Sequence, residues 1–211
     1  MGRPSDARQR LIAAANKVIY AHSYEGVTVD ELCVAAGVTK SSFYHFFASK
    51  QELVLVALES QWQRFEETLL LPAFSDHLPP QERMVRFFDL MLEKQQAQKQ
   101  TSGHMYGCPI GNLTLELSTQ DELIRTRAEQ FFQEWLSYFE QMLREAKEQG
   151  IVPASLDTAV TAQALLAYFE GVMLLAKGRN DPALIASLRA GTLALMQYQG
   201  ERASYPSDNN Y

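Results

Sequence analysis

The chain has 211 residues, a net charge of −6 at pH 7 and two cysteines. This length is enough for one domain, or for a small domain joined to a larger one, with a sizeable buried core. The two cysteines are far apart in the chain, which excludes a disulfide framework. Because no apolar run approaches the length of about 18 residues that a membrane span needs, we expect no membrane segment. The first five residues lack the apolar core of a secretory signal, so we expect a cytoplasmic protein.

The charge is distributed unevenly along the chain. Residues 1–50 hold six Lys or Arg against four Asp or Glu, whereas residues 51–211 hold thirteen against twenty-one. This asymmetry fits a small nucleic-acid-binding head on an acidic body, because the phosphate backbone repels the body and so orients the encounter. The chain shows no internal repeat, no glycine-rich phosphate loop and no strand-rich segment. Its apolar residues recur at helical spacing, so we predict an all-α fold.

A first helix is predicted from about Ser5, where one apolar stripe begins. The stripe consists of Leu11, Ile12, Ala15, Val18 and Ile19. We expect this helix to pack across the two short helices that follow it. Ahead of it, Arg3 either belongs to an arm that contacts phosphate or the minor groove, or lies in a frayed terminus. The sequence leaves both alternatives open.

Residues 28–47 predict two short helices joined by a tight turn. Thr28 and Glu31 have the spacing of a capping box, in which each side chain bonds the backbone amide of the other residue. Gly37 is placed to end the first helix, because glycine adopts positive φ without a Cβ clash. Thr39 can then cap the second helix.

The second helix of this pair has two different faces. Phe43 and Phe47, four residues apart, share the apolar face. The outer face carries Lys40, Ser41, Tyr44 and His45. In a helix-turn-helix, such a face enters the major groove of DNA and reads base edges. An ordinary helical hairpin with a solvated face is the alternative that these residues alone leave open.

A longer helix is predicted to begin at a second capping box, Ser49 with Glu52, and to run to about Leu71. Pro72 and the proline pair at 79–80 bracket a loop. The next predicted helix carries the apolar residues Met84, Val85, Phe87, Phe88, Met91 and Leu92, and it ends in the polar run 95–100.

Four more helices are predicted after this one. The first is short, at about 112–118, and the second begins at a capping box of Thr119 and Glu122 and closes at Gly150. The boundaries of the last two are marked by Pro153 and Gly178, and by Asp181 and Gly200. Residues 201–211 have no periodicity, and we expect them to be disordered.

Many residues of the first quarter of the chain stand in one specific register. They are Gly26, Thr28, Leu32, Ala36, Gly37, Val38, Thr39, Phe43, Tyr44, Phe46, Phe47, Lys50 and Leu53. This set resembles the DNA-binding domain of TetR-family transcriptional repressors. Cys33 departs from the small residue that is usual there, but a buried thiol is itself a small hydrophobe. Phe46 is a second departure, next to a position that His or Tyr often fills.

The resemblance implies a DNA-binding regulator, a repressor of transcription, that is not an enzyme and needs no cofactor and no metal. Residues 1–50 would form the helix-turn-helix head, and residues 51–200 the body that binds an effector and dimerises. The partner of the head would be double-stranded operator DNA. The residues implied to contact it are Thr28, Thr39, Lys40, Ser41, Ser42, Tyr44, His45 and Lys50. Lys50 would bind phosphate at the start of the long helix, together with the local backbone amides.

Small side chains are frequent in the last two predicted helices, and they allow helices to approach closely. Ala164, Ala167, Gly171, Gly191 and Ala194 are examples. The resemblance implies that these helices form the interface of a homodimer, since paired heads need a two-fold axis. An intramolecular core is the competing interpretation.

Cys108 is the residue of the body with the most distinctive surroundings. It lies between Gly107 and Pro109, ahead of a predicted helix start, and His104 precedes it by four residues. Helix N-termini and nearby cations stabilise the thiolate, which is the form that reacts with electrophiles and oxidants. A small buried residue in a tight turn is the alternative.

Residues 107–108, with Gly171, Ala176 and Lys177, are similar to the sensor region of TetR-family repressors that respond to electrophiles and chlorine oxidants, and of acrylate-responsive ones. The resemblance implies that Cys108 and Lys177 take part in the response to a small molecule, an electrophile or an oxidant. A cation at its helix C-terminus would explain Lys177 equally well. For the walls of an apolar effector pocket we expect Trp62, Phe65, Phe87, Met91, Tyr106, Phe131, Trp135, Tyr138 and Tyr168.

Two other functions compete with this interpretation. A helical enzyme could use Cys108 as a nucleophile, but it would need a base and an orienting partner. The four histidines, His22, His45, His77 and His104, are scattered, and no acidic partner is evident near Cys108 in the sequence. A regulator whose body binds another protein, and no small molecule, is the third possibility.

Overall fold

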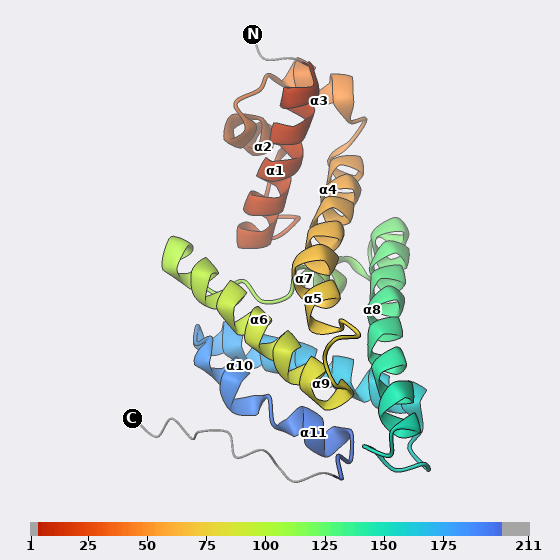
Figure 1. Cartoon of the computed structure of the whole chain (residues 1–211). Coiled ribbons are helices and arrows are strands. Elements are labelled where there is room, and N and C mark those ends of the chain that lie inside the picture. The colour runs from red at the N-terminus through yellow and green to blue at the C-terminus, as the bar shows by residue number, and fades with distance from the viewer. Residues whose placement is uncertain (1–3, 200–211) are drawn as a thin grey trace.

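The computed structural model describes residues 4–199, and every regular element in that range is a helix. At one end of the molecule lie α1 (Pro4–His22), α2 (Val29–Ala36) and α3 (Lys40–Phe46), and α4 (Lys50–Phe65) leads from them into the body (Figure 1). The all-α prediction is therefore confirmed. Arg3 and the tail 201–211 lie outside the described residues.

Local capping explains the helix-turn-helix. The Glu31 amide donates to Thr28 Oγ1 (3.2 Å) and the Thr28 amide donates to Glu31 Oε2 (2.8 Å), which is the predicted capping box. Gly37 has a φ of +61° and ends α2 as expected. Arg10 of α1 fixes this turn, because its guanidinium donates to the carbonyls of Ala36 (2.8 Å) and Gly37 (2.9 Å). The first helix thus packs across the pair, as predicted.

The long helix begins at Ser49, whose hydroxyl accepts from the Glu52 amide at 3.1 Å. The expected return bond is shifted by one residue, because the Glu52 carboxylate accepts from the Ala48 amide (2.6 Å) and not from that of Ser49. After α4 the helix continues through a π-helical turn, Glu66–Leu70, into the short α5 (Leu71–Ala73). One added residue per turn rotates the faces of the helix, and such turns often lie at functional sites.

The next two helices are α6 (Pro80–Ser102) and α7 (Pro109–Leu117). The prediction for α7 was wrong by three residues: proline is favoured in the first turn of a helix, so α7 begins at Pro109 with Cys108 as its N-cap. Gly111, which lies ahead of the predicted start, is therefore inside this helix.

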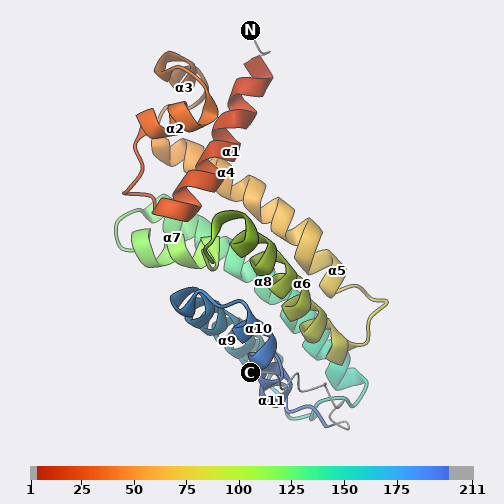
Figure 2. The ribbon, with the colours of Figure 1, turned by 90° about the vertical axis from the view of Figure 1, so that its left-hand side faces the viewer.

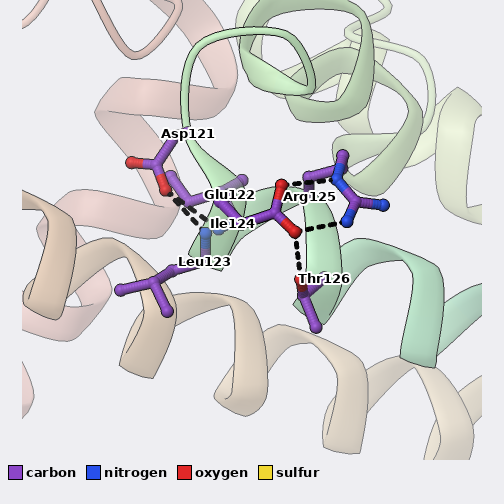
Figure 3. Close-up of polar contacts among 6 residues, drawn as sticks. All are labelled: Asp121, Glu122, Leu123, Ile124, Arg125 and Thr126. Carbon is purple, nitrogen blue, oxygen red and sulfur yellow. Dashed lines mark hydrogen bonds and ion pairs between the residues drawn. The ribbon is translucent and has the colours of Figure 1, made fainter.

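The start of α8 (Glu122–Glu148) is a second correction. Asp121, and not Thr119, is its N-cap, and its carboxylate accepts from the amides of Leu123 and Ile124, both at 3.1 Å (Figure 3). Aspartate is among the strongest caps, because its charge also suits the positive end of the helix. The predicted end at Gly150 is right within two residues, and Gly150 has a φ of +69°.

The C-terminal part contains α9 (Thr158–Arg179), α10 (Ala183–Leu188) and α11 (Gly191–Leu195). Asn180, with a φ of +51°, ends α9, so the predicted stop at Gly178 was wrong. The side chain of Asn180 explains this, since it accepts from the Met105 amide (2.8 Å) and donates to the Gly103 carbonyl (3.0 Å). The single last helix that we predicted is in fact two short ones.

By length and composition α9 could cross a membrane, which corrects our statement that no apolar run approaches that length. Its best 18-residue window has a mean hydropathy of 1.5, and 44% of that window is buried inside the molecule. One such helix is weak evidence, because the core helix of a globular protein has the same properties. Its buried face packs against α8 and α10, while Val160, Leu174 and Leu175 are exposed.

Candidate DNA interface and effector site

The polar face of α3 is open at one end of the molecule. Lys40, Ser41, Tyr44 and His45 are exposed, Tyr44 to 53%, whereas Phe43 behind them is fully buried. Ser42 is half-buried, and its amide donates to the Thr39 cap at 3.1 Å. The predicted groove-facing residues therefore form one continuous surface.

The residues predicted to bind phosphate already have intramolecular partners. The hydroxyls of Thr28 and Thr39 cap α2 and α3. The Lys50 ammonium donates to the carbonyls of Tyr24 and Val27, both at 3.0 Å, and lies 4.0 Å from the centre of the Tyr24 ring. Because an ammonium has three N–H groups, two such bonds leave one for a phosphate.

Lys40 is paired with Asp30 of α2 at 3.0 Å, and both side chains are exposed. The hydrogen bond and charge of Asp30 raise the pKa of Lys40. An exposed pair of this kind contributes little to stability, so another anion can displace Asp30 at low cost.

The expected effector pocket is almost filled by its own aromatic rings. Phe65 and Trp135 are 4.7 Å apart between ring centres, Trp62 and Phe131 are 5.1 Å apart, and Phe87 lies 5.7 Å from Trp135. The cavity that remains has a volume of about 20 Å³, which is room for about one water molecule. Of the predicted wall residues, Trp62, Phe65, Met91 and Trp135 line it together with Cys108, and we call it the inner cavity.

Three predicted wall residues do not line the inner cavity. Tyr106 meets the edge of Tyr20 (5.2 Å), Tyr138 donates to Glu66 (2.6 Å), and Tyr168 donates to the Leu188 carbonyl (2.6 Å). Helical spacing indicated that these tyrosines face the interior, but it does not show which other side chains they contact. Phe87 and Phe131 do not line the inner cavity, but they pack against the lining residues Trp135 and Trp62, respectively.

The sequence analysis missed three polar side chains that line the inner cavity, those of Gln61, Lys94 and Gln95. Gln95 is only 2% exposed, and its Nε2 donates to the Gly107 carbonyl at 3.3 Å. Its Oε1 and the Nε1 of the fully buried Trp135 have no hydrogen-bond partner among the described residues. Buried polar groups are rarely left unpaired, so these two atoms suit a bound molecule. The run 95–100 had been predicted as a polar helix end, but Gln95 follows Met91 by four residues on the apolar face, and that spacing was the available signal.

Cys108 is buried at the start of α7, close to α9. Its Sγ accepts from the Gly111 amide at 3.4 Å, and the carboxyl group of Glu170 lies within hydrogen-bonding reach. Burial, and next the charge of Glu170, raise the pKa of this thiol well above its usual value. A thiolate stabilised by the helix start and by His104 was one of the two interpretations that the sequence left open. Burial and a carboxylate oppose it, and His104 is exposed.

Lys177 lies near Cys108 but is bonded to another residue, since its ammonium donates to Asn112 Oδ1 at 2.9 Å. Its Cδ would lie 3.0 Å from a Cβ at residue 107, and Gly107 has a φ of +81°, so only glycine fits there. Lys177, Glu170 and Cys108 all line an open pocket of about 290 Å³, the outer pocket. Cys108 therefore forms part of the wall between the inner cavity and the outer pocket.

Both parts of the chain match models of known protein families. Residues 11–57 match the model described as bacterial regulatory proteins, tetR family, and residues 80–192 match the tetracyclin repressor-like C-terminal domain. The first match covers the head and the second covers most of the body, including Cys108 and α9.

Relatives and solved structures agree with these matches. The transcriptional regulator AcuR of Cereibacter sphaeroides is 34% identical over 190 residues, which are 86% of this chain and 84% of AcuR. The transcriptional repressor NemR of Escherichia coli is 24% identical over 172 residues, covering 82% and 84%. A crystal structure of the regulatory protein TetR from Rhodobacter sphaeroides has a TM-score of 0.80 and 29% identity, covering 92% and 99% of the two chains.

These matches do not support the alternative of a helical thiol enzyme. The chain belongs to the TetR family of bacterial regulatory proteins, and it is a DNA-binding regulator of transcription and not an enzyme.

Proposed function

We propose that this protein is a homodimeric repressor that leaves its operator when a small electrophile adds to Cys108. The observation that carries the proposal is the position of this thiol between the inner cavity, with its unpaired Gln95 Oε1 and Trp135 Nε1, and the open outer pocket. Residues 1–50 act as the DNA-binding part, and residues 51–200 bind the effector and dimerise.

The DNA-binding part uses the exposed face of α3. Lys40, Ser41, Tyr44 and His45 face the major groove with Ser42 at their edge, while Thr28, Thr39, Lys50 and nearby amides lie at the phosphates. Two such heads in a dimer fit a palindromic operator when they are about 34 Å apart, one turn of DNA, or a multiple of it.

The dimer interface is centred on the outer face of α9. Val160, Ala167 and Leu174 are exposed along this face, at intervals of seven residues. An apolar stripe that stays in water is unfavourable unless a partner covers it. A second copy is the expected partner, because an isologous interface brings the same face of both subunits together and pairs the heads.

The effector is a small molecule with an activated double bond. A protonated thiol reacts slowly with dilute electrophiles, but a molecule held against it reacts at a high effective concentration. A carbonyl oxygen can accept from Trp135 Nε1, and an N–H or O–H group of the same molecule can donate to Gln95 Oε1. Addition forms the S–C bond, and the thiol proton goes to the carbon next to the carbonyl group, so no oxidant is consumed.

An adduct that occupies the inner cavity, beside Gln95 Oε1 and Trp135 Nε1, cannot fit without a change of structure. The inner cavity holds about one water molecule, whereas even a three-carbon amide has several non-hydrogen atoms. An adduct that points into this cavity must therefore displace the aromatic rings or the first turn of α7. This displacement favours a dimer whose heads no longer match the operator spacing.

The test uses acrylamide as the electrophile and DNA from upstream of the gene, with binding followed by fluorescence anisotropy. In a Cys33→Ser background, where Cys108 is the single thiol, we expect the stoichiometric adduct to release the DNA. The matched Cys33→Ser/Cys108→Ser protein should bind DNA equally well and remain bound after the same treatment. Release of both proteins would point to a reversible ligand, and retention of both would refute the role of Cys108.

A further inference from the structure

The helix that Cys108 begins is bonded to the DNA-binding head at both of its ends. At its start, the Gly107 carbonyl accepts hydrogen bonds from the Tyr20 hydroxyl of α1 and from Gln95 Nε2. Near its end, the Glu116 carboxylate accepts from the amides of Tyr24 (3.0 Å) and Glu25 (2.8 Å) in the turn after α1. Figure 2 shows α7 directly below the end of α1, between the head and α9.

The hydrogen bond from Tyr20 is made to Gly107, the residue directly before Cys108. The carbonyl of Gly107 belongs to the same peptide group as the nitrogen of Cys108. Burial raises the pKa of Tyr20, so its hydroxyl keeps the proton that it donates. A shift of the Cys108 backbone must therefore move the Tyr20 side chain or break this bond.

The bonds to Glu116 connect α7 to further contacts inside the head. The turn that Glu116 holds also supplies the carbonyls of Tyr24 and Val27, which accept from the Lys50 ammonium at the start of α4. Bonds from a carboxylate to amides are stronger than neutral ones. A movement of α7 is thus transmitted to the turn before α2 and to the first residue of α4, which follows the reading helix.

The hydrogen bonds made by Tyr20 and Glu116 lie at a cleft between the head and the body. A cleft of about 600 Å³ opens between the end of α1, α4 and α7, and both Tyr20 and Glu116 line it. Where packing is incomplete, a few hydrogen bonds have a larger share in fixing the angle between the two parts. At 1.5 Å per residue α1 is about 28 Å long, so a tilt of about 10° at its Tyr20 end moves its far end by about 5 Å.

We infer that Tyr20 and Glu116 are positioning residues that couple Cys108 to the DNA-binding head: an adduct at Cys108 shifts the first turn of α7, and the two bonds convert this shift into a tilt of α1 and α2. The inference rests on the proposed function, since it describes how release is transmitted. According to this inference, the loss of DNA affinity after modification depends on the Tyr20 hydroxyl and the Glu116 carboxylate, whereas the affinity of the unmodified protein does not.

The experiment compares Tyr20→Phe, Glu116→Ala and the parent protein, all with Cys33→Ser, before and after acrylamide treatment. Intact mass shows that Cys108 carries one adduct in each, and thermal melts show that each is folded. Tyr168→Phe is the matched control. It also loses a hydroxyl that donates to a backbone carbonyl, that of Leu188, but Tyr168 lines neither the inner cavity, nor the outer pocket, nor the cleft. Operator affinity is measured for every protein in both states.

In the parent and in Tyr168→Phe, we expect the adduct to lower operator affinity by about tenfold or more, within the usual range of coupling between sites. In Tyr20→Phe and Glu116→Ala, unmodified affinity should stay within about threefold of the parent, and the adduct should change it less than about threefold. If the modified variants release DNA as fully as the parent, the coupling role is wrong while the proposed function stands. If the modified parent keeps its DNA, the proposed function fails and this inference fails with it.

Discussion

Cys108 lies against the carboxyl group of Glu170, and the two residues come from helices that face each other, α7 and α9. Glu170 is half-buried, and its Oε1 is buried without a hydrogen-bond partner among the described residues. A negative charge beside a thiol disfavours the thiolate. Burial first, and this charge second, raise the pKa of the Cys108 thiol although it stands at the start of a helix.

Replacing Glu170 with Gln should make Cys108 more reactive. Burial is the largest cause of the raised thiol pKa and the Glu170 charge is the next. Removal of the charge therefore lowers the pKa of Cys108 without restoring its usual value, and the thiolate fraction near neutral pH rises. We expect alkylation to become a few-fold faster between about pH 7 and about pH 8, below the usual thiol pKa.

The measurement is the rate of mass increase with acrylamide in the Cys33→Ser background. Glu140→Gln is the control, because Glu140 pairs with Arg144 on the outer face of α8 and is remote in sequence from the thiol. A slower reaction in Glu170→Gln would mean that this carboxylate acts as a base for the thiol and does not suppress it.

Gly111→Ala should destabilise the protein even though alanine is the better helix former. A Cβ at residue 111 would collide with the Glu170 carboxylate and lie 3.5 Å from Cys108 Cβ. Overpacking of this kind costs about 1–3 kcal/mol. Gly178→Ala is the matched control inside α9, where nothing lies within 4 Å of the new Cβ, and it should stabilise by about 0.5–1 kcal/mol. Urea unfolding of both variants measures the difference, and equal stabilities would contradict the close contact at Glu170.

The predictable parts of this protein were those with local causes. Thr28, Glu31 and Gly37 act on residues within four positions of themselves, so the helix-turn-helix was readable from the sequence. The start of α8 was misplaced because Thr119 and Asp121 are both good caps, and only Asp121 also accepts from Gln51 of α4 (2.6 Å). Such a choice depends on a contact seventy residues away.

The effector site was predictable only in its apolar part. Aromatic residues at helical spacing indicated a cluster, and Trp62, Phe65, Met91 and Trp135 do meet there. The chemistry at Cys108 depends on Glu170, which is sixty-two residues later in the chain and reaches the thiol from α9. A sequence shows the helix start that would lower the thiol pKa but not the burial that raises it.

Tyr44→Ala should weaken operator binding without unfolding the protein. Tyr44 is 53% exposed on the outer face of α3, and a contact in the groove contributes about 1–3 kcal/mol. Phe43→Ala is the contrasting variant, because Phe43 is fully buried and its truncation costs about 3–5 kcal/mol of stability. Anisotropy with operator DNA and thermal melts separate the two effects. Unchanged operator affinity in a folded Tyr44→Ala protein would exclude this face of α3 as the reading surface.

Leu174→Glu should separate the dimer and thereby abolish operator binding. Leu174 is 59% exposed on the outer face of α9, and a carboxylate there would be buried opposite its own copy across a two-fold axis. Leu71→Glu is the matched control, because Leu71 is 53% exposed on α5, away from α9. Light scattering after size-exclusion chromatography gives the mass of each variant, and circular dichroism shows whether the helices remain.

A folded Leu174→Glu monomer that no longer holds the operator is the expected result, because one head alone makes half of the DNA contacts. A Leu174→Glu protein that stays dimeric would place the interface on another face, and a Leu71→Glu monomer would place it at α5.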